Sequence, residues 1–282
     1  MSELPISIQK AVSRYKTIET NGLKLYPVLV SEYDLFLAAR PALEVMHQSL
    51  PVALMRVPLL SALYQMDYEA ILSGETPSGL FSRALLALAL ALRLGEGLDA
   101  AERMKMIQFS VDRTEPQKLL RLRFTDGDGT EHEISPAQFK PLREIIAAQN
   151  GVELESDLAN PDLVRAQKDM NTAGAPTLDA NVEDLICAVS ALSGTEEEEI
   201  DQWPILKLQR RAESYQRMIQ YVVCGIGEVN GTTWKGGNPS PHPFFRRAER
   251  NTLLSELGTR SDGKIPAPPE AAREVAKITE KL

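Results

Sequence analysis

The clearest structural signal lies in residues 119–151, which have the sequence LLRLRFTDGDGTEHEISPAQFKPLREIIAAQNG. Apolar and polar side chains alternate over residues 120–125, as they do in a half-buried strand. The run Asp126-Gly127-Asp128-Gly129 contains residues that tolerate positive φ, and residues 130–134 lead back along a second strand. The pattern therefore predicts a β-hairpin over residues 120–134.

A capped helix is predicted directly after this hairpin. Ser135-Pro136-Ala137-Gln138 combines an N-cap serine, a proline at the first helical position and a glutamine that can complete a capping box. The pair Asn150-Gly151 is typical of a helix end, because glycine readily adopts the left-handed conformation found there. One face of the helix is apolar and carries Phe139, Leu142, Ile145 and Ile146.

The N-terminal part of the chain is predicted to be helical as well. Ser31 is expected to cap a helix that starts at Glu32, where an acidic first turn suits the helix dipole. Residues 81–94 are expected to form a buried core helix. The apolar run at its centre, residues 84–92, is too short for a membrane span, which needs about 20 residues.

Two amphipathic helices are predicted in the C-terminal half. The first covers residues 181–192 and ends at Gly194. Thr195 and Glu198 have the spacing of a capping box at the next helix start. The longer helix covers residues 204–229, with apolar positions at Ile205, Leu208, Ala212, Tyr215, Ile219, Val222 and Val223.

These elements predict a mainly α fold, made of helical bundle modules with one small β-hairpin inserted mid-chain. The expected order along the chain is a flexible lead-in at 1–25, an N-terminal helical domain at 26–115, a β-hairpin plus capped helix connector at 116–152, a linker at 153–180, a C-terminal helical module at 181–230, and a loop and mobile tail at 231–282.

Composition bounds the class of protein. A formal net charge of −8 argues against a general nucleic-acid binder, because phosphate contacts need a basic surface. The two cysteines, Cys187 and Cys224, are too few for a disulfide framework or a four-ligand zinc site. Residues 1–16 lack the apolar core of a signal peptide. We therefore expect a cytoplasmic protein that binds neither nucleic acid nor membrane.

No catalytic, cofactor or metal site is predicted. Residues 126–131 resemble a calcium loop in composition, but an EF-hand loop spans about twelve residues between two helices, and here both flanks are strands. His47, His132 and His242 have no spacing that suits a metal site or an activated nucleophile. The sequence therefore favours a protein that is not an enzyme.

The segment around Trp234 is the candidate for a partner contact. Its glycines do not form a phosphate loop, since no Gly-Lys-Ser/Thr leads into a helix. Aromatic and arginine side chains dominate binding hot spots. The possible contact residues are Trp234, Lys235, Phe244, Phe245 and Arg246. The alternative is that these aromatics pin the loop to its own domain.

Two parts of the chain resemble known phage proteins. Ile134 to Phe139, followed by Leu142 to Ile146 and Gln149-Asn150-Gly151, resembles a segment of tail-morphogenesis proteins of bacteriophages of Gram-positive hosts. Val182 to Val189, then Trp203-Pro204-Ile205 and the helix through Arg210 and Tyr215, is similar to the helical module of phage tail assembly chaperones. The resemblance implies a helical, acidic protein that binds the tape-measure protein before the tail tube polymerises around it. The family has no catalytic motif to carry over.

Three functional hypotheses follow. The leading one is a non-enzymatic phage or prophage tail assembly protein of the bacterial host cytoplasm, which binds a tape-measure or other tail partner as a chaperone does. The second is a structural component of the virion tail or baseplate. The third is an enzyme with a cryptic site. The sequence leaves the oligomeric state and the identity of the partner open.

Overall fold

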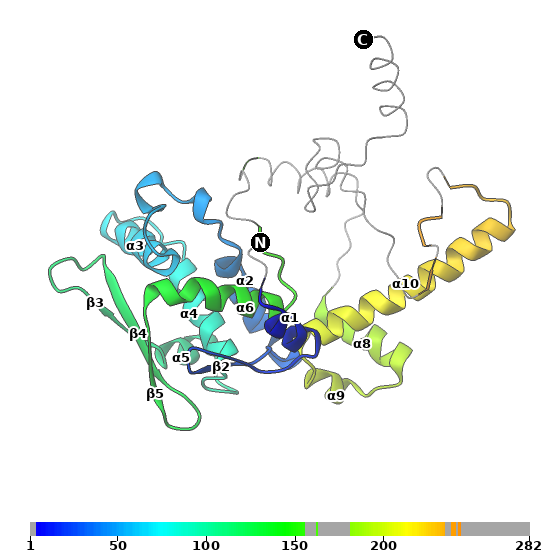
Figure 1. Ribbon diagram of the computed structural model, residues 1–282, viewed down its shortest axis with the longest axis horizontal. Helices are drawn as coiled ribbons and strands as arrows, with labels where there is room; N and C mark the ends of the chain where they lie inside the picture. Colours follow the sequence, from blue (N-terminus) through cyan, green and yellow to red (C-terminus); the bar gives the residue numbers. More distant parts are fainter. Residues whose placement is uncertain (1–3, 156–161, 163–180, 235–237, 241, 244–282) are drawn as a thin grey trace, which may run out of the picture. The chain divides into compact units, whose positions relative to one another are not determined.

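The computed structural model describes residues 4–155, 162, 181–234, 238–240 and 242–243 (Figure 1). Within these residues the protein is mainly α-helical, with one two-stranded and one three-stranded sheet, which confirms the predicted fold class. The chain divides into two compact units, Met1–Tyr215 and Gln216–Leu282, which are called unit 1 and unit 2 below.

Most of the elements belong to unit 1. In chain order they are α1 (Ile6–Ser13), β1 (Ile18–Thr20), β2 (Leu23–Leu25), α2 (Tyr33–Glu44), α3 (Leu59–Leu72), α4 (Leu80–Ala91), α5 (Ala100–Lys105), β3 (Gln108–Val111), β4 (Leu119–Thr125), β5 (Glu131–Ile134), α6 (Phe139–Gln149), α8 (Val182–Ser193) and α9 (Glu197–Asp201). Helix α10 (Ile205–Val229) begins in unit 1 and continues into unit 2.

Helix α4 forms the centre of the main core. Every residue from Ala84 to Ala91 is buried, which explains why this segment alternates leucine and alanine without a polar face. Helices α2 and α3 pack against it. The prediction of a buried core helix here is confirmed.

The predicted hairpin is present as β4 and β5, which pair antiparallel with Leu122 opposite Ile134 and Phe124 opposite His132. Leu122, Phe124 and Ile134 are buried, so the period-two pattern correctly marked the inner face. A third strand, β3, pairs with the other edge of β4 and was not predicted. Figure 1 shows the three strands side by side, next to α3, α4 and α6.

The predicted helix after the hairpin is also confirmed. Gln138 accepts a hydrogen bond from the backbone N–H of Ser135 at 2.8 Å, as in a capping box, and a single 3-10 turn at Pro136–Gln138 leads into α6. The apolar face of α6 is buried, and Gly151 just after its end has a φ of 71°.

Residues 116–152 are part of the main core, so the expected role as a connector between two modules is wrong. The Asn150 side chain accepts from the Val28 N–H at 2.9 Å. The Gln149 amide donates to the carbonyls of Lys16 and Leu25, both at 3.2 Å. Buried residues of β4, β5 and α6 belong to the same apolar cluster as α2, α3 and α4. The hairpin and helix therefore close the N-terminal core instead of bridging to another one.

The N-terminal residues also differ from the expected flexible lead-in. Residues 6–25 form α1, β1 and β2, and Val12, Leu23 and Leu25 are buried in the main core. The two strands have three residues each, too few to show a hydrophobic period, and Gln149, which bonds to the Lys16 and Leu25 carbonyls, lies more than a hundred residues away. The prediction of a flexible lead-in was therefore wrong for residues 6–25.

Two predicted helix caps are wrong as well. Ser31 lies inside a 3-10 turn, Val30–Glu32, and α2 begins at Tyr33 with no side-chain cap. Helix α9 begins after Glu196, again with no side-chain cap, so Thr195 does not form a capping box. By contrast, Asn181 does cap α8, where it accepts from the Asp184 N–H at 2.7 Å.

The C-terminal helices of unit 1 add a smaller apolar cluster, formed by Val30, Ile186, Val189, Ile200, Trp203 and Leu208. Backbone hydrogen bonds hold it to the N-terminal part: the Val30 N–H donates to the Trp203 carbonyl at 2.8 Å, and the Ile205 N–H donates to the Val28 carbonyl at 3.0 Å. Most of the predicted linker at 153–180 and most of the predicted tail at 231–282 lie outside the described residues.

Candidate functional site

An open apolar groove in unit 1 lies among α3, the start of α4, α5 and β3. Its volume is about 960 Å³. Four aromatic rings line it, those of Tyr64 and Tyr68 on α3, Phe81 on α4 and Phe109 on β3. We call this surface the aromatic groove.

The four rings pack against one another and hold the groove in shape. The Tyr64 ring stacks on Tyr68 at 6.0 Å between centroids and meets Phe81 edge-on at 5.0 Å. Phe109 lies 5.7 Å from Tyr64 and 5.4 Å from Phe81. The Tyr64 hydroxyl donates to the Pro116 carbonyl at 3.1 Å. Burial raises the pKa of Tyr64, and the nearby Tyr68 adds to this effect, so its phenol stays neutral at ordinary pH.

The rim of the aromatic groove exposes apolar side chains. Ile71 is 63% exposed and Phe109 is 49% exposed, although both are large and apolar. Large side chains of this kind gathered around a hollow are typical of surfaces that bind an apolar partner. Among the described residues that line the groove, Asp67 and Lys105 are the charged ones.

The Asp67 carboxylate is used by the fold itself. It accepts hydrogen bonds from the Ser78 hydroxyl at 2.6 Å and from the backbone N–H groups of Gly79 and Phe81, each at 3.0 Å. It therefore caps the start of α4 from a neighbouring helix, satisfying N–H groups that have no partner inside the helix. Because both of its oxygens accept hydrogen bonds from the start of α4, Asp67 fixes the shape of the groove.

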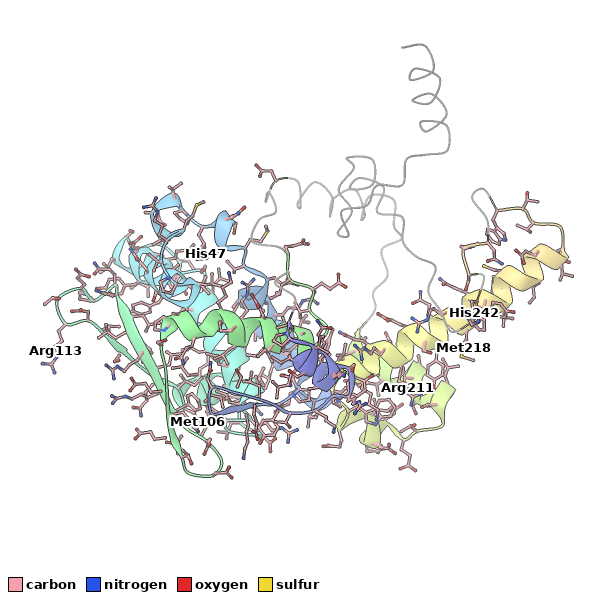
Figure 2. All side chains as sticks on the ribbon, in the orientation of Figure 1. His47, Met106, Arg113, Arg211, Met218 and His242 are labelled. Atoms are coloured by element: carbon pink, nitrogen blue, oxygen red, sulfur yellow. The ribbon has the colours of Figure 1, made fainter. Side chains whose placement is uncertain are left out.

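A second candidate surface is an apolar stripe on the part of α10 that belongs to unit 2. Ile219, Val222, Ile226 and Val229 form it, and they are 53%, 56%, 57% and 89% exposed. Met218, labelled in Figure 2, and Val223 flank the stripe and are also exposed. We call this surface the α10 stripe. The predicted apolar face ended at Val223, and the structure extends it by two further residues.

The loop after α10 packs on another face of the helix. A Cβ atom placed on Gly227 would lie 3.5 Å from Cζ2 of Trp234. The Glu228 carboxylate accepts from the Asn238 amide at 2.9 Å, and Cys224 is buried. Cys224, Gly227 and Glu228 are spaced as one face of a helix, away from the stripe. Trp234 thus lies against its own helix, whereas Lys235, Phe244, Phe245 and Arg246 lie outside the described residues.

His132, on strand β5, contacts an acid of the hairpin turn. Nε2 of His132 lies 2.7 Å from Oδ2 of Asp126, and its ring stacks on Phe124 at 5.4 Å. Oδ1 of Asp126 accepts from the backbone N–H groups of Asp128 and Thr130. The hydrogen bond from His132, followed by that from Thr130, lowers the pKa of Asp126. The Asp-Gly-Asp-Gly run is therefore a hairpin turn, and the Asp126 side chain stabilises it by accepting hydrogen bonds from the backbone of the turn.

Two buried arginines also serve the fold. Arg103 is 1% exposed and forms an ion pair with Glu32, which ties α5 to the turn before α2. Arg143 on α6 donates to the carbonyls of Leu43 and Val45 at 2.5 and 2.7 Å, at the end of α2. These cations satisfy groups that would otherwise be buried without partners.

Metal-ligating side chains do not gather in the part of the chain that the structure describes: no three His, Cys, Asp or Glu residues there are placed to hold a metal ion. Among the described helices, none is both long and apolar enough to cross a membrane. Comparison of the chain with protein-family models, curated proteins and solved structures found no match.

The sequence does not predict the aromatic groove as a whole, because its walls come from four separate segments. A partial signal was present: Tyr64 and Tyr68 are four residues apart, a spacing that places both rings on one face of a helix. The α10 stripe had a stronger signal. Its apolar residues follow one another at alternating steps of three and four positions as far as Val229.

Proposed function

We propose that the protein is a non-enzymatic assembly factor that binds an apolar helix of a protein partner in the aromatic groove. The observation that carries this proposal is the groove itself: four packed aromatic rings with an exposed apolar rim. An amphipathic helix laid into a groove buries its apolar face against such rings and keeps its polar face in water.

The open form of the groove favours a helix over a small molecule. Small-molecule pockets usually enclose most of the ligand surface. Here Ile71 and Phe109 stand half exposed or more at the rim, where they can cover the flanks of a partner helix. The lining has little charge to select an ionic ligand, since the Asp67 carboxylate is already engaged.

The partner we propose is the tape-measure protein or another tail protein of a phage or prophage. Support comes from the resemblance of residues 134–151 and 182–215 to tail-morphogenesis proteins and tail assembly chaperones, and from the acidic, helical character of the chain. Covering the apolar helices of such a partner in the host cytoplasm would keep it from aggregating until the tail tube assembles.

Co-expression with the tape-measure protein tests this proposal. The expected result is a complex that co-purifies, together with a rise in the soluble fraction of the partner. Phe109→Gln should reduce the recovered complex by at least about tenfold, because it removes an aromatic ring from the groove. Leu120→Gln is the matched control: Leu120 is an exposed apolar residue of the same sheet that does not line the groove.

Two outcomes of this experiment would contradict the proposal. The tail-assembly role is wrong if the unmodified chain neither binds the tape-measure protein nor raises its solubility. The groove is the wrong surface if Phe109→Gln and Leu120→Gln leave the complex equally abundant. Circular dichroism of both variants checks that each keeps the helical content of the parent chain.

A further inference from the structure

We propose that the α10 stripe is a self-association surface, on which the same stripe of a second copy of this chain packs. This interaction is separate from partner binding in the aromatic groove and uses residues of unit 2 alone. Its basis is the spacing, exposure and charge of the residues in the second half of α10.

The spacing is that of a coiled coil. Apolar residues follow at steps of three and four along the whole helix: Ile205, Leu208, Ala212, Tyr215, Ile219, Val222, Ile226 and Val229. An average step of 3.5 residues keeps the apolar residues on one side along the whole helix, so the seam that packs in unit 1 continues into unit 2.

In the first half of α10, the apolar residues of the repeat are covered by unit 1. Ile205 and Leu208 are each 1% exposed, and Ala212 and Tyr215 pack against the smaller apolar cluster of unit 1. In the second half the same repeat continues with Ile219, Val222, Ile226 and Val229, all more than half exposed. Among the described residues, none covers this part of the seam.

The described residues of the loop after α10 do not cover the stripe. Trp234 and Asn238 contact Gly227 and Glu228, which lie on a different face of the helix. Cys224, which lies on the same side of the helix as Gly227 and Glu228, is buried, in contrast to the stripe. A helix supported on one face and apolar on the other presents a preformed half of an interface.

The residues that flank the stripe suit an identical partner. In coiled coils, charges beside the seam select one partner over another and repel copies that carry the same charge. Here the flanking positions hold Gln216, Met218, Val223 and Gly225, which carry no charge. Two copies can therefore approach along the stripe without local repulsion, and no charge pattern calls for a different chain.

The exposed area is sufficient for a reversible dimer. The four stripe residues together with Met218 and Val223 are each 45% to 89% exposed. Their combined surface, roughly 700 Å², is an upper limit on the area that one copy could bury, and it approaches the value of about 800 Å² per partner in a typical specific interface. All six residues are apolar, so most of this area contributes through the hydrophobic effect. We therefore expect a dimer that dissociates on dilution.

Sedimentation velocity of the full chain, at about 1 to 100 µM to bracket weak dissociation constants, tests the inference. The expected result is a shift from one chain to two as the concentration rises. Ile226→Glu, which places a charge in the seam, should raise the dissociation constant at least tenfold. Gln220→Glu is the matched control, since it adds the same charge to the same helix outside the stripe.

Three further measurements distinguish a lost interface from a lost fold. Ile226→Leu keeps an apolar side chain and should keep the dimer. Circular dichroism should show equal helicity in all variants, and Ile226→Glu should still bind the tape-measure protein if the groove proposal holds. A chain that stays monomeric throughout overturns the inference, as does an equal effect of Ile226→Glu and Gln220→Glu. Failure of the groove proposal leaves this measurement unaffected.

Discussion

Single side chains in this protein hold backbone that is distant in sequence or tightly turned. Asp67 caps α4 from α3, and Asp126 binds two N–H groups of its own turn while contacting His132. Both acids lie near features that suggest chemistry, a groove in one instance and a histidine in the other. Their hydrogen bonds show that the fold already uses them, because a carboxylate with filled acceptor sites is a structural anchor.

The Asp126 carboxylate predicts a pH dependence of stability. Its pKa is lowered in the folded chain by His132 and the Thr130 N–H, below the ordinary value of 3.8. A lowered folded pKa gives a contribution that is present above about pH 4 and is lost as the pH falls through the folded pKa. Asp126→Asn should therefore lower the melting temperature more at pH 6 than at pH 3.

Thermal melts of the two chains at both pH values measure this difference. Taking the difference between the chains removes the effect of other acids, such as Glu133, whose pKa is also lowered by Arg121 and Arg123. An equal destabilisation at pH 6 and pH 3 would show that the charge of Asp126 does not matter.

At the scale of elements, long periodic segments were predictable and short strands were not. The hairpin, the capped α6 and the core helix α4 each carry their periodicity within one continuous segment. Strands β1, β2 and β3 have three or four residues, too few to show a period, and each is defined by its partner. The aromatic groove was missed for the same reason: it exists only after α3, α4, α5 and β3 have packed together.

The junction between α6 and α10 provides a test of packing between elements. Gly151 has a φ of 71°, and a Cβ atom there would lie 3.2 Å from Cδ1 of Leu206 and closer still to the Gln209 amide. The Gln209 side chain can move away, but the positive φ strains any other residue. Gly151→Ala should lower the free energy of unfolding by about 1–2 kcal/mol.

Urea denaturation of Gly151→Ala and of Gly127→Ala measures this effect. Gly127 lies in the hairpin turn, has no positive φ and has open space where a Cβ would be added. The control should change stability by less than about 0.5 kcal/mol. Equal changes in the two variants would mean that the end of α6 tolerates a side chain.

At the scale of the whole molecule, the acidic balance of the chain opposes its own association. Each copy carries a formal net charge of −8, so two copies repel one another even though the α10 stripe is neutral. Surface repulsion of this kind depends on ionic strength, whereas apolar contact in the stripe depends on it much less. The net charge follows from the composition, whereas the exposure of the stripe is visible only in the structure.

The dimer should therefore strengthen as salt is added. Raising the salt concentration from about 0.01 M to about 0.1 M shortens the Debye length from about 30 Å to about 10 Å. The dissociation constant measured by sedimentation should fall several-fold over this range. A rise in the dissociation constant would instead indicate that ion pairs hold the copies together, contrary to a neutral seam.

The two amides at the end of α6 have a consequence for how the chain is made. Gln149 and Asn150 hydrogen-bond to the backbone of Lys16, Leu25 and Val28, across separations of 122 to 133 residues. During synthesis on the ribosome, the first 28 residues emerge long before these amides exist. The N-terminal helix and its two short strands are thus translated well before the two amides that hold them, and the nascent chain must carry them without these hydrogen bonds until residue 150 has left the exit tunnel.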